Sequence, residues 1–112
     1  MAYKVIVAET AERELDEALS YIAVHYSSPQ AMGSLLGAFN SAKDSLKAHP
    51  AIFSIHESAS RATGREIRRV RVNGYGLFYF VDEKKHVVSA ISLLHSRRDV
   101  AWRIARDYVQ LN

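Results

Sequence analysis

Hydrophobic and polar positions change their period about halfway along the chain. Before residue 50, apolar side chains recur three or four residues apart, which is typical of amphipathic helices. After residue 65 they form short continuous runs between turns, which is typical of buried strands. A short β-branched run at residues 3–8 precedes the helical part. The pattern therefore predicts one strand, a pair of helices and then a sheet.

The helical half of the chain predicts an antiparallel hairpin of two helices. Thr10 is a good N-cap for a first helix that runs to about residue 26. Ser28 and Pro29 predict the start of a second helix, with serine as N-cap and proline at the first helical position. This helix ends before Pro50, because the residue that precedes a proline avoids the α region.

Two further expectations concern the faces of these helices. Gly33 and Gly37 lie inside the second helix, where each glycine costs about 1 kcal/mol relative to alanine. We expect them to allow a close approach to the alanine-rich side of the first helix. The carboxylates of the first helix are expected on its solvent face, which argues against a catalytic carboxylate pair there.

The second half of the chain predicts a three-stranded antiparallel meander. The strands cover residues 65–72, 75–82 and 86–95, and the Asn73-Gly74 pair between the first two is a strong hairpin signal. The middle strand is apolar and aromatic throughout, so we expect it to be buried on both faces.

The remaining segments complete one domain over residues 1–112. Residues 51–64 are small and polar and are expected to form a loop, at the long end for a connection without regular structure. A short amphipathic helix is expected from Arg98 to about Val109. The predicted order is β-α-α-β-β-β-α, an α+β fold in which the helical hairpin packs on one face of an antiparallel sheet.

Composition excludes several classes of protein. No segment approaches the roughly 20 apolar residues that a membrane span needs, and no signal-peptide pattern opens the chain. The absence of cysteine excludes disulfides, thiolate metal sites and a cysteine nucleophile. We therefore expect a cytoplasmic protein without a membrane partner.

The net charge of +3 hides an asymmetry between the two halves of the chain. Residues 1–50 hold four Lys/Arg and six Asp/Glu, and residues 51–112 hold eleven and six. A basic half beside an acidic half suggests an anionic partner, either nucleic acid or an acidic protein segment. The alternative is an ordinary solvated basic face.

The titratable residues predict neither a metal site nor a cofactor. The five histidines show no short ligand spacing, and the chain has no phosphate-binding glycine loop, nucleophile elbow or zinc-protease motif. These histidines are His25, His49, His56, His86 and His95.

The remaining chemical signal is a basic segment after the last predicted strand, near the arginines of the first meander strand. Guanidinium groups suit phosphate or carboxylate, because each is a planar, permanently charged fork of donors. A histidine among them suits acid–base chemistry in RNA cleavage. The alternative is that Asp99 pairs with an arginine and the rest is a solvated rim. The residues concerned are His95, Arg97 and Arg98, with Arg68 and Arg71 on the strand.

The ordered set of segments resembles the RelE/ParE superfamily of bacterial type II toxins over nearly the whole chain. The most similar segments are Ile67-Arg68-Arg69-Val70-Arg71-Val72-Asn73-Gly74-Tyr75, Phe78-Tyr79-Phe80-Val81-Asp82 and Leu93-Leu94-His95-Ser96-Arg97-Arg98-Asp99, supported by Ala11-Glu12-Arg13-Glu14-Leu15, Tyr21-Ile22, Ser28-Pro29-Gln30-Ala31 and Leu46-Lys47-Ala48-His49-Pro50. The resemblance implies a small toxin that is neutralised by an antitoxin encoded beside it.

The superfamily implies one of two activities. RelE-like members are ribosome-dependent endoribonucleases that cut mRNA in the ribosomal A site, whereas ParE-like members act on DNA gyrase. In RelE-like toxins a catalytic arginine commonly follows the tyrosine at the start of the middle strand, but here Gly76 follows Tyr75. A second arginine and a late tyrosine of RelE-like toxins would fall near Ser96 and Trp102, which also mismatch.

These mismatches favour a ParE-like gyrase inhibitor that acts by binding, with no catalytic residue and no cofactor. The alternative is a RelE-like, metal-independent mRNA interferase that would use His95, Arg97 and Arg98, with Arg68 or Arg71. Its partners would then be the ribosome and mRNA.

Both activities imply the same kind of antitoxin contact. We expect the antitoxin tail in a groove beside the sheet, as a helix or an added strand, with acidic residues that meet the arginines. A homodimer is also allowed. The residues expected to meet the antitoxin or the target are Arg68, Arg71, Tyr79, His95, Arg97 and Arg98.

Overall fold

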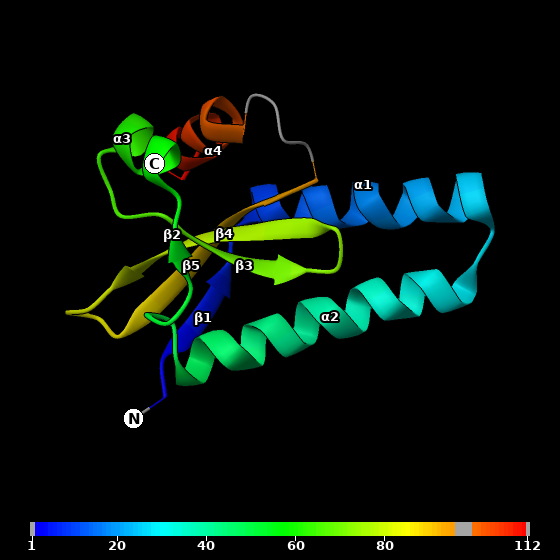
Figure 1. Cartoon of the computed structure of the whole chain (residues 1–112), viewed down its shortest axis with the longest axis horizontal. Helices are drawn as coiled ribbons and strands as arrows, with labels where there is room; N and C mark the ends of the chain where they lie inside the picture. Colours follow the sequence, from blue (N-terminus) through cyan, green and yellow to red (C-terminus); the bar gives the residue numbers. More distant parts are fainter. Residues whose placement is uncertain (1, 96–99, 112) are drawn as a thin grey trace.

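The computed structural model describes residues 2–95 and 100–111 (Figure 1). In chain order the elements are β1 (Lys4–Val7), α1 (Glu9–Tyr26), α2 (Pro29–Ala48), β2 (Ser54–Ile55), α3 (Glu57–Thr63), β3 (Arg68–Val72), β4 (Tyr75–Asp82), β5 (Val87–Leu94) and α4 (Val100–Val109).

The strands form one sheet in the order β1-β5-β4-β3-β2. β1 runs parallel to β5, and all other neighbouring strands are antiparallel. The predicted meander is therefore confirmed as β3, β4 and β5, and the opening strand joins it beside β5. The predicted start of the second helix is also confirmed, because the Ser28 hydroxyl accepts a hydrogen bond from the Ala31 amide at 3.1 Å.

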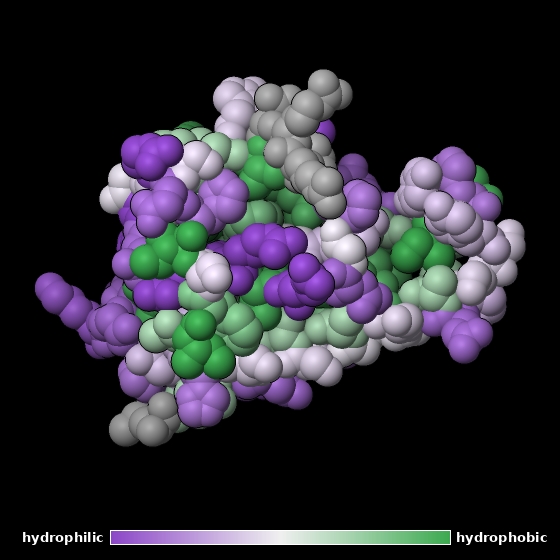
Figure 2. Space-filling view, viewed as in Figure 1, coloured by the Kyte–Doolittle hydropathy of each residue, from purple (hydrophilic) through white to green (hydrophobic). Residues whose placement is uncertain are grey.

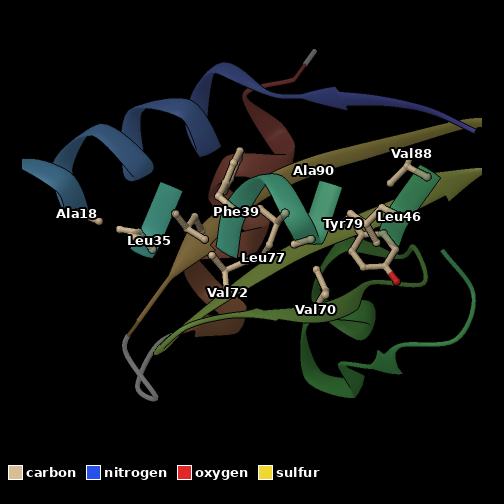
Figure 3. Packing of buried hydrophobic residues seen from close by; sticks show 12 residues of the cluster. Ala18, Leu35, Phe39, Leu46, Val70, Val72, Leu77, Tyr79, Val88 and Ala90 are labelled. Atoms are coloured by element: carbon tan, nitrogen blue, oxygen red, sulfur yellow. The ribbon is translucent and has the colours of Figure 1, made fainter. Parts of the chain in front are cut away.

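Helices cover both faces of this sheet. On one face, α2 packs its apolar side over the middle strands, and Figure 3 shows Phe39 close to Leu77 and Leu46 close to Tyr79. On the other face, α3 and α4 cover a second cluster, to which Phe80 of β4 belongs. β4 is therefore buried on both faces, as its continuous apolar run predicts.

An irregularity in β5 decides which way its last residues face. Phe78 pairs with Ser92 while Tyr79 pairs with Ala90, so that Ile91 has no partner on β4. Such an extra residue shifts the alternation of side chains by one position. As a result, Ser92 faces α4 and not the helical hairpin.

β1 ends at Val7, which pairs with Ala90 of β5. Beyond this point, side chains of α1 bind the backbone groups on the outer edge of β5. The Thr10 hydroxyl donates to the Ile91 carbonyl at 2.6 Å. Two residues further along the strand, Glu14 Oε1 accepts from the Leu93 amide at 2.9 Å. Polar side chains thus satisfy backbone groups that a longer β1 would have paired.

The expectation of an irregular loop at residues 51–64 was wrong, because this segment holds β2 and α3. The His56 ring accepts from the Ala59 amide at 3.2 Å and caps the start of α3. Gly64 ends the helix in the left-handed conformation, with φ 73°. The seven-residue helix is held by the buried Ala59 side chain, which is too small to produce a recognisable hydrophobic period.

Two expectations about the helical hairpin were also wrong. α1 begins at Glu9, so Thr10 lies inside its first turn and its hydroxyl binds β5 in place of the helix end. Gly33 and Gly37 are exposed, and a Cβ added to either would meet no atom within 4 Å. These glycines therefore do not bring α2 close to α1.

We expect Gly64→Ala to lower the free energy of unfolding by about 1 kcal/mol, because an L residue is strained in the left-handed conformation. A methyl group at this position would meet no other atom, so the cost comes from the backbone alone. Gly33→Ala is the matched control, and it should stabilise the exposed interior of α2 by up to about 1 kcal/mol. Urea denaturation of both variants checks the opposite signs, and effects of the same sign would contradict the assignment.

None of the helices within residues 2–95 and 100–111 combines the length and the apolar character that crossing a membrane requires.

Candidate functional site

An open groove of about 1,210 Å³ lies between the helical hairpin, the end of β5 and α4. Its walls are α1, the first half of α2, the end of β5 and α4, and the turn between β3 and β4 closes one side. Figure 1 shows this turn directed between the two helices of the hairpin. The floor is apolar and includes Ala18, Ile22, Leu35, Leu93 and Leu94.

Aromatic side chains gather along the groove. The rings of Tyr75 and His95 lie 5.0 Å apart, and those of Tyr21 and Tyr26 meet edge to face at 6.1 Å. Burial raises the pKa of the Tyr75 hydroxyl, and the nearby Tyr21 and Tyr26 add to this effect. Exposed aromatic rings beside a concave apolar surface are typical of sites that bind another chain, because they supply a large contact area at a low cost in side-chain entropy.

Charges of both signs border the aromatic residues. Arg13 and Glu17 of α1 face the groove on one side, and Arg103 and Arg106 of α4 face it on the other. Such a rim suits an amphipathic partner that presents an apolar face and carries charged residues at its margins.

A pair of carboxyl groups lies where α1, β5 and α4 meet. Asp107 is almost fully buried and accepts a hydrogen bond from the Ser92 hydroxyl at 2.8 Å. Arg106 Nη2 lies 3.3 Å from Asp107 Oδ1 and 3.9 Å from Glu14 Oε2. One guanidinium therefore serves two carboxyl groups.

The expectation that the carboxylates of the first helix lie on its solvent face was wrong for Glu14, whose side chain is only 12% exposed. Burial raises the pKa of Glu14 to about 8, and the hydrogen bond with Asp107 and the charge of Asp107 act in the same direction. The Leu93 amide and Arg106 oppose this rise. Glu14 follows Ala11 by three residues and precedes Ala18 by four, so the helical period does put it on the buried side.

The residues expected on the binding surface do not share one face of the sheet. Arg68 pairs with Tyr79 across the strands, on the side of the helical hairpin. The Arg68 guanidinium donates to the Phe53 carbonyl and lies 3.0 Å from Glu66 Oε1, and its side chain is 19% exposed. Both bonds fix Arg68 within the fold.

Tyr79 is fully buried and belongs to the core of the free chain. Its hydroxyl donates to the Pro50 carbonyl. Burial raises its pKa to about 12, so the hydroxyl stays protonated at neutral pH.

Arg71 is exposed and alternates with the buried Val70 and Val72, so it faces away from the helical hairpin, as Arg69 does. The Arg69 side chain lies over Gly76, so that a Cβ added to Gly76 would clash with Arg69 Nε. Figure 2 shows strongly hydrophilic side chains over the middle of the molecule, where Figure 1 has β3.

Of the expected site residues that the structure describes, His95 alone lines the groove, where it is exposed beside Tyr75. Arg97 and Arg98 lie outside the described residues. The sequence pattern did not indicate the aromatic lining, although Tyr21 and Tyr26 close the first helix and Tyr75 follows the hairpin turn directly. Within the described part of the chain, no three His, Asp or Glu residues gather to hold a metal ion.

Comparison with known proteins gives two kinds of match. The family model described as the ParE toxin of the type II toxin-antitoxin system parDE matches residues 5–100. The archaeal RelE-RelB complex from Pyrococcus horikoshii OT3 contains a chain that is 22% identical, with a TM-score of 0.55 over 87% of this chain and 99% of that chain.

A mutant of toxin RelE from E. coli, in the free state, is 20% identical, with a TM-score of 0.58. This match covers 99% of the present chain and 98% of that chain. At such identities the two structures establish a shared fold. No curated protein gives a significant match.

Proposed function

Because the chain belongs to the ParE family of type II toxin-antitoxin toxins, within the RelE/ParE superfamily, we propose that it inhibits DNA gyrase by binding it and is not an enzyme. The observation that carries this proposal is Gly76, a residue without a side chain at the position where RelE-like toxins commonly have a catalytic arginine. Trp102, near the position of their late tyrosine, has no ionisable group. At these two positions the chain thus has no charged or ionisable side chain of the kind that such a nuclease directs at its transition state.

The decisive experiment runs two assays side by side with the purified chain. We expect it to inhibit supercoiling by gyrase and to leave mRNA intact on translating ribosomes. Cleaved mRNA together with normal supercoiling would overturn the proposal. Gyrase titrated with the same chain after heat denaturation is the control for non-specific inhibition by a basic protein.

A second candidate is a RelE-like, ribosome-dependent mRNA endoribonuclease that needs no metal, and one arrangement favours it. The Arg69 side chain lies over Gly76, so a guanidinium stands close to the place of the missing arginine. Burial and then the charge of Arg69 lower the pKa of His56, which favours a neutral imidazole that accepts a proton at pH 7. If mRNA is cleaved and His56 is the base, Arg69→Ala and His56→Ala should each abolish the cleavage. If His95 acts in place of His56, His95→Ala should abolish the cleavage.

The proposed cellular partner is an antitoxin encoded beside the toxin, in the cytoplasm. The archaeal neighbour was solved as a complex of RelE with RelB, which supports a protein partner for this fold. The groove offers an apolar floor, three tyrosines and a charged rim, which suit an amphipathic helix of the antitoxin. Acidic residues of the antitoxin would face Arg13 and Arg103. Arg97 and Arg98 stay proposed contacts because of their charge.

A further inference from the structure

Besides the apolar cluster around Ile104, a polar contact holds α4 against α1 and β5, and this contact contains more negative than positive groups. Glu14 of α1 and Asp107 of α4 are both largely removed from water, and among the described residues Arg106 is the cation within 4 Å of both. If both carboxyl groups were ionised, one negative charge would be left without a counter-charge in a buried setting, which is costly. One proton between the two carboxyl groups makes the trio neutral.

The hydrogen bonds from uncharged groups of the chain are compatible with one shared proton. Glu14 Oε1 already accepts from the Leu93 amide, and Asp107 Oδ2 accepts from the Ser92 hydroxyl. The remaining oxygens, Glu14 Oε2 and Asp107 Oδ1, both lie within 4 Å of Arg106 Nη2. A proton on one of them gives the pair a donor that two carboxylates lack.

We propose that Glu14 and Asp107 hold one proton between them while α4 is docked, so that loss of this proton loosens α4 from α1 and β5. Within the described part of the chain, the charged and titratable groups that line the same groove are few, and only Arg106 reaches the pair. The others are Arg13 and Glu17 on α1, Arg103 on α4, His95 after β5, and the tyrosines Tyr21, Tyr26 and Tyr75.

The direction of the pH effect follows because α4 is docked when the Glu14–Asp107 pair holds its proton. A carboxylic acid whose pKa is raised by folding adds stability that is complete at low pH, and this stability is lost as the pH rises through the folded pKa. The relevant window runs from about the ordinary value of 4.5 to about 8 for Glu14. α4 should therefore be held firmly at pH 6 and more loosely at pH 9.

The consequence reaches the groove, because α4 supplies one of its walls through Arg103, Arg106 and Gln110. Alkaline pH should open that wall. This inference stands on contacts within the chain and holds whether gyrase or the ribosome is the target.

Amide hydrogen exchange of the full chain tests whether the shared proton holds α4 in place. The rates at pH 6 and pH 9 are corrected for intrinsic exchange. With the pKa of Glu14 at about 8 in the docked form and near 4.5 in the undocked form, raising the pH from 6 to 9 removes about two pK units of stabilisation, so protection within α4 should fall by roughly a hundredfold. Amides of β4, which is buried on both faces, should keep their protection. Equal protection of α4 at both pH values would overturn the proposal.

Matched variants separate the shared proton from a general effect of pH. Glu14→Gln keeps the shape and mimics the protonated acid, since its amide nitrogen donates to Asp107 while its oxygen accepts from Leu93. The protection of α4 should then be the same at pH 6 and pH 9. Glu12→Gln removes an exposed carboxylate from the same helix and should behave like the natural sequence. If the protection of α4 fell between pH 6 and pH 9 as much in Glu14→Gln as in the natural sequence, the proposed shared proton would be refuted.

A direct titration guards against a variant that does not fold. The side-chain carboxyl carbon of Glu14 can be followed by NMR in the natural sequence between pH 4 and pH 9. A midpoint above 7 supports the shared proton. A midpoint near the ordinary glutamate value of about 4.3 would rule it out.

Discussion

Replacing Tyr79 with alanine should lower the free energy of unfolding by about 3 to 5 kcal/mol, the range typical of removing a large aromatic ring from a core. The Tyr79 ring is fully buried between β4 and α2, among Val70, Leu46 and Val88. Its loss leaves a cavity and also removes the donor that binds the Pro50 carbonyl. Chemical denaturation at pH 7 measures the change.

The conservative variant Tyr79→Phe divides this loss into its parts. It keeps the ring and leaves only the Pro50 carbonyl without its partner, so it should cost about 1 to 3 kcal/mol. Antitoxin affinity should be unchanged, because the hydroxyl does not reach the surface. If Tyr79→Phe left stability intact but weakened antitoxin binding, Tyr79 would be a contact residue after all.

Replacing Tyr75 with alanine should weaken antitoxin binding by about 30-fold or more, which corresponds to the 2 kcal/mol that marks a central interface residue. Tyr75 lies half-buried in the groove beside His95, with Tyr21 and Tyr26 close by. A partner helix would cover its exposed edge and exclude water from the ring. Calorimetric titration with the antitoxin encoded beside the toxin measures the affinity.

Two controls make this result specific to the groove. Tyr75→Phe keeps the ring and should bind within about threefold of the natural sequence, because burial of the ring carries the contact. Ile52→Ala removes an exposed apolar side chain outside the groove and should change nothing. An equal loss of affinity with Ile52→Ala would mean that the antitoxin covers a different surface.

The parts of the fold that follow from local pattern could be predicted. The continuous apolar run of β4 reflects burial on both faces, and Asn73 adopts a positive φ of 54° in the turn that the Asn-Gly pair predicts. The start of α2 follows from Ser28 and Pro29. In these cases neighbouring residues supply the determining contacts.

What the pattern did not reveal depends on contacts between distant segments. α3 has a histidine cap and a single buried alanine, and neither produces a helical period. Glu14 was interpreted as a solvent-facing acid because its partners, Leu93 and Asp107, lie about 80 and 90 residues further along the chain. The burial of Asp107 likewise depends on Ser92, which faces α4 because of the extra residue in β5.

The candidate site shows the same division. Arginines on β3 were recognised as a group, but strand alternation sends Arg68 to one side of the sheet and Arg71 to the other. A two-residue period predicts that separation, and it sets a limit on any site that requires both side chains at once. The groove itself arises from the meeting of α1, α2 and α4, which a sequence pattern does not specify.

β2 is only two residues long, so in the described part of the chain it leaves part of the outer edge of β3 unpaired. β2 pairs only with Arg68 and Arg69, so residues 70–72 of β3 pair with β4 on one side but, among the described residues, have no strand on the other side. An unpaired edge is a template on which identical copies can stack and aggregate. Arg71 lies in this stretch, and a second copy added in the same register would bring like charges together. The charge of Arg71 therefore disfavours edge-to-edge pairing of two copies, an effect that is separate from any recognition of a target.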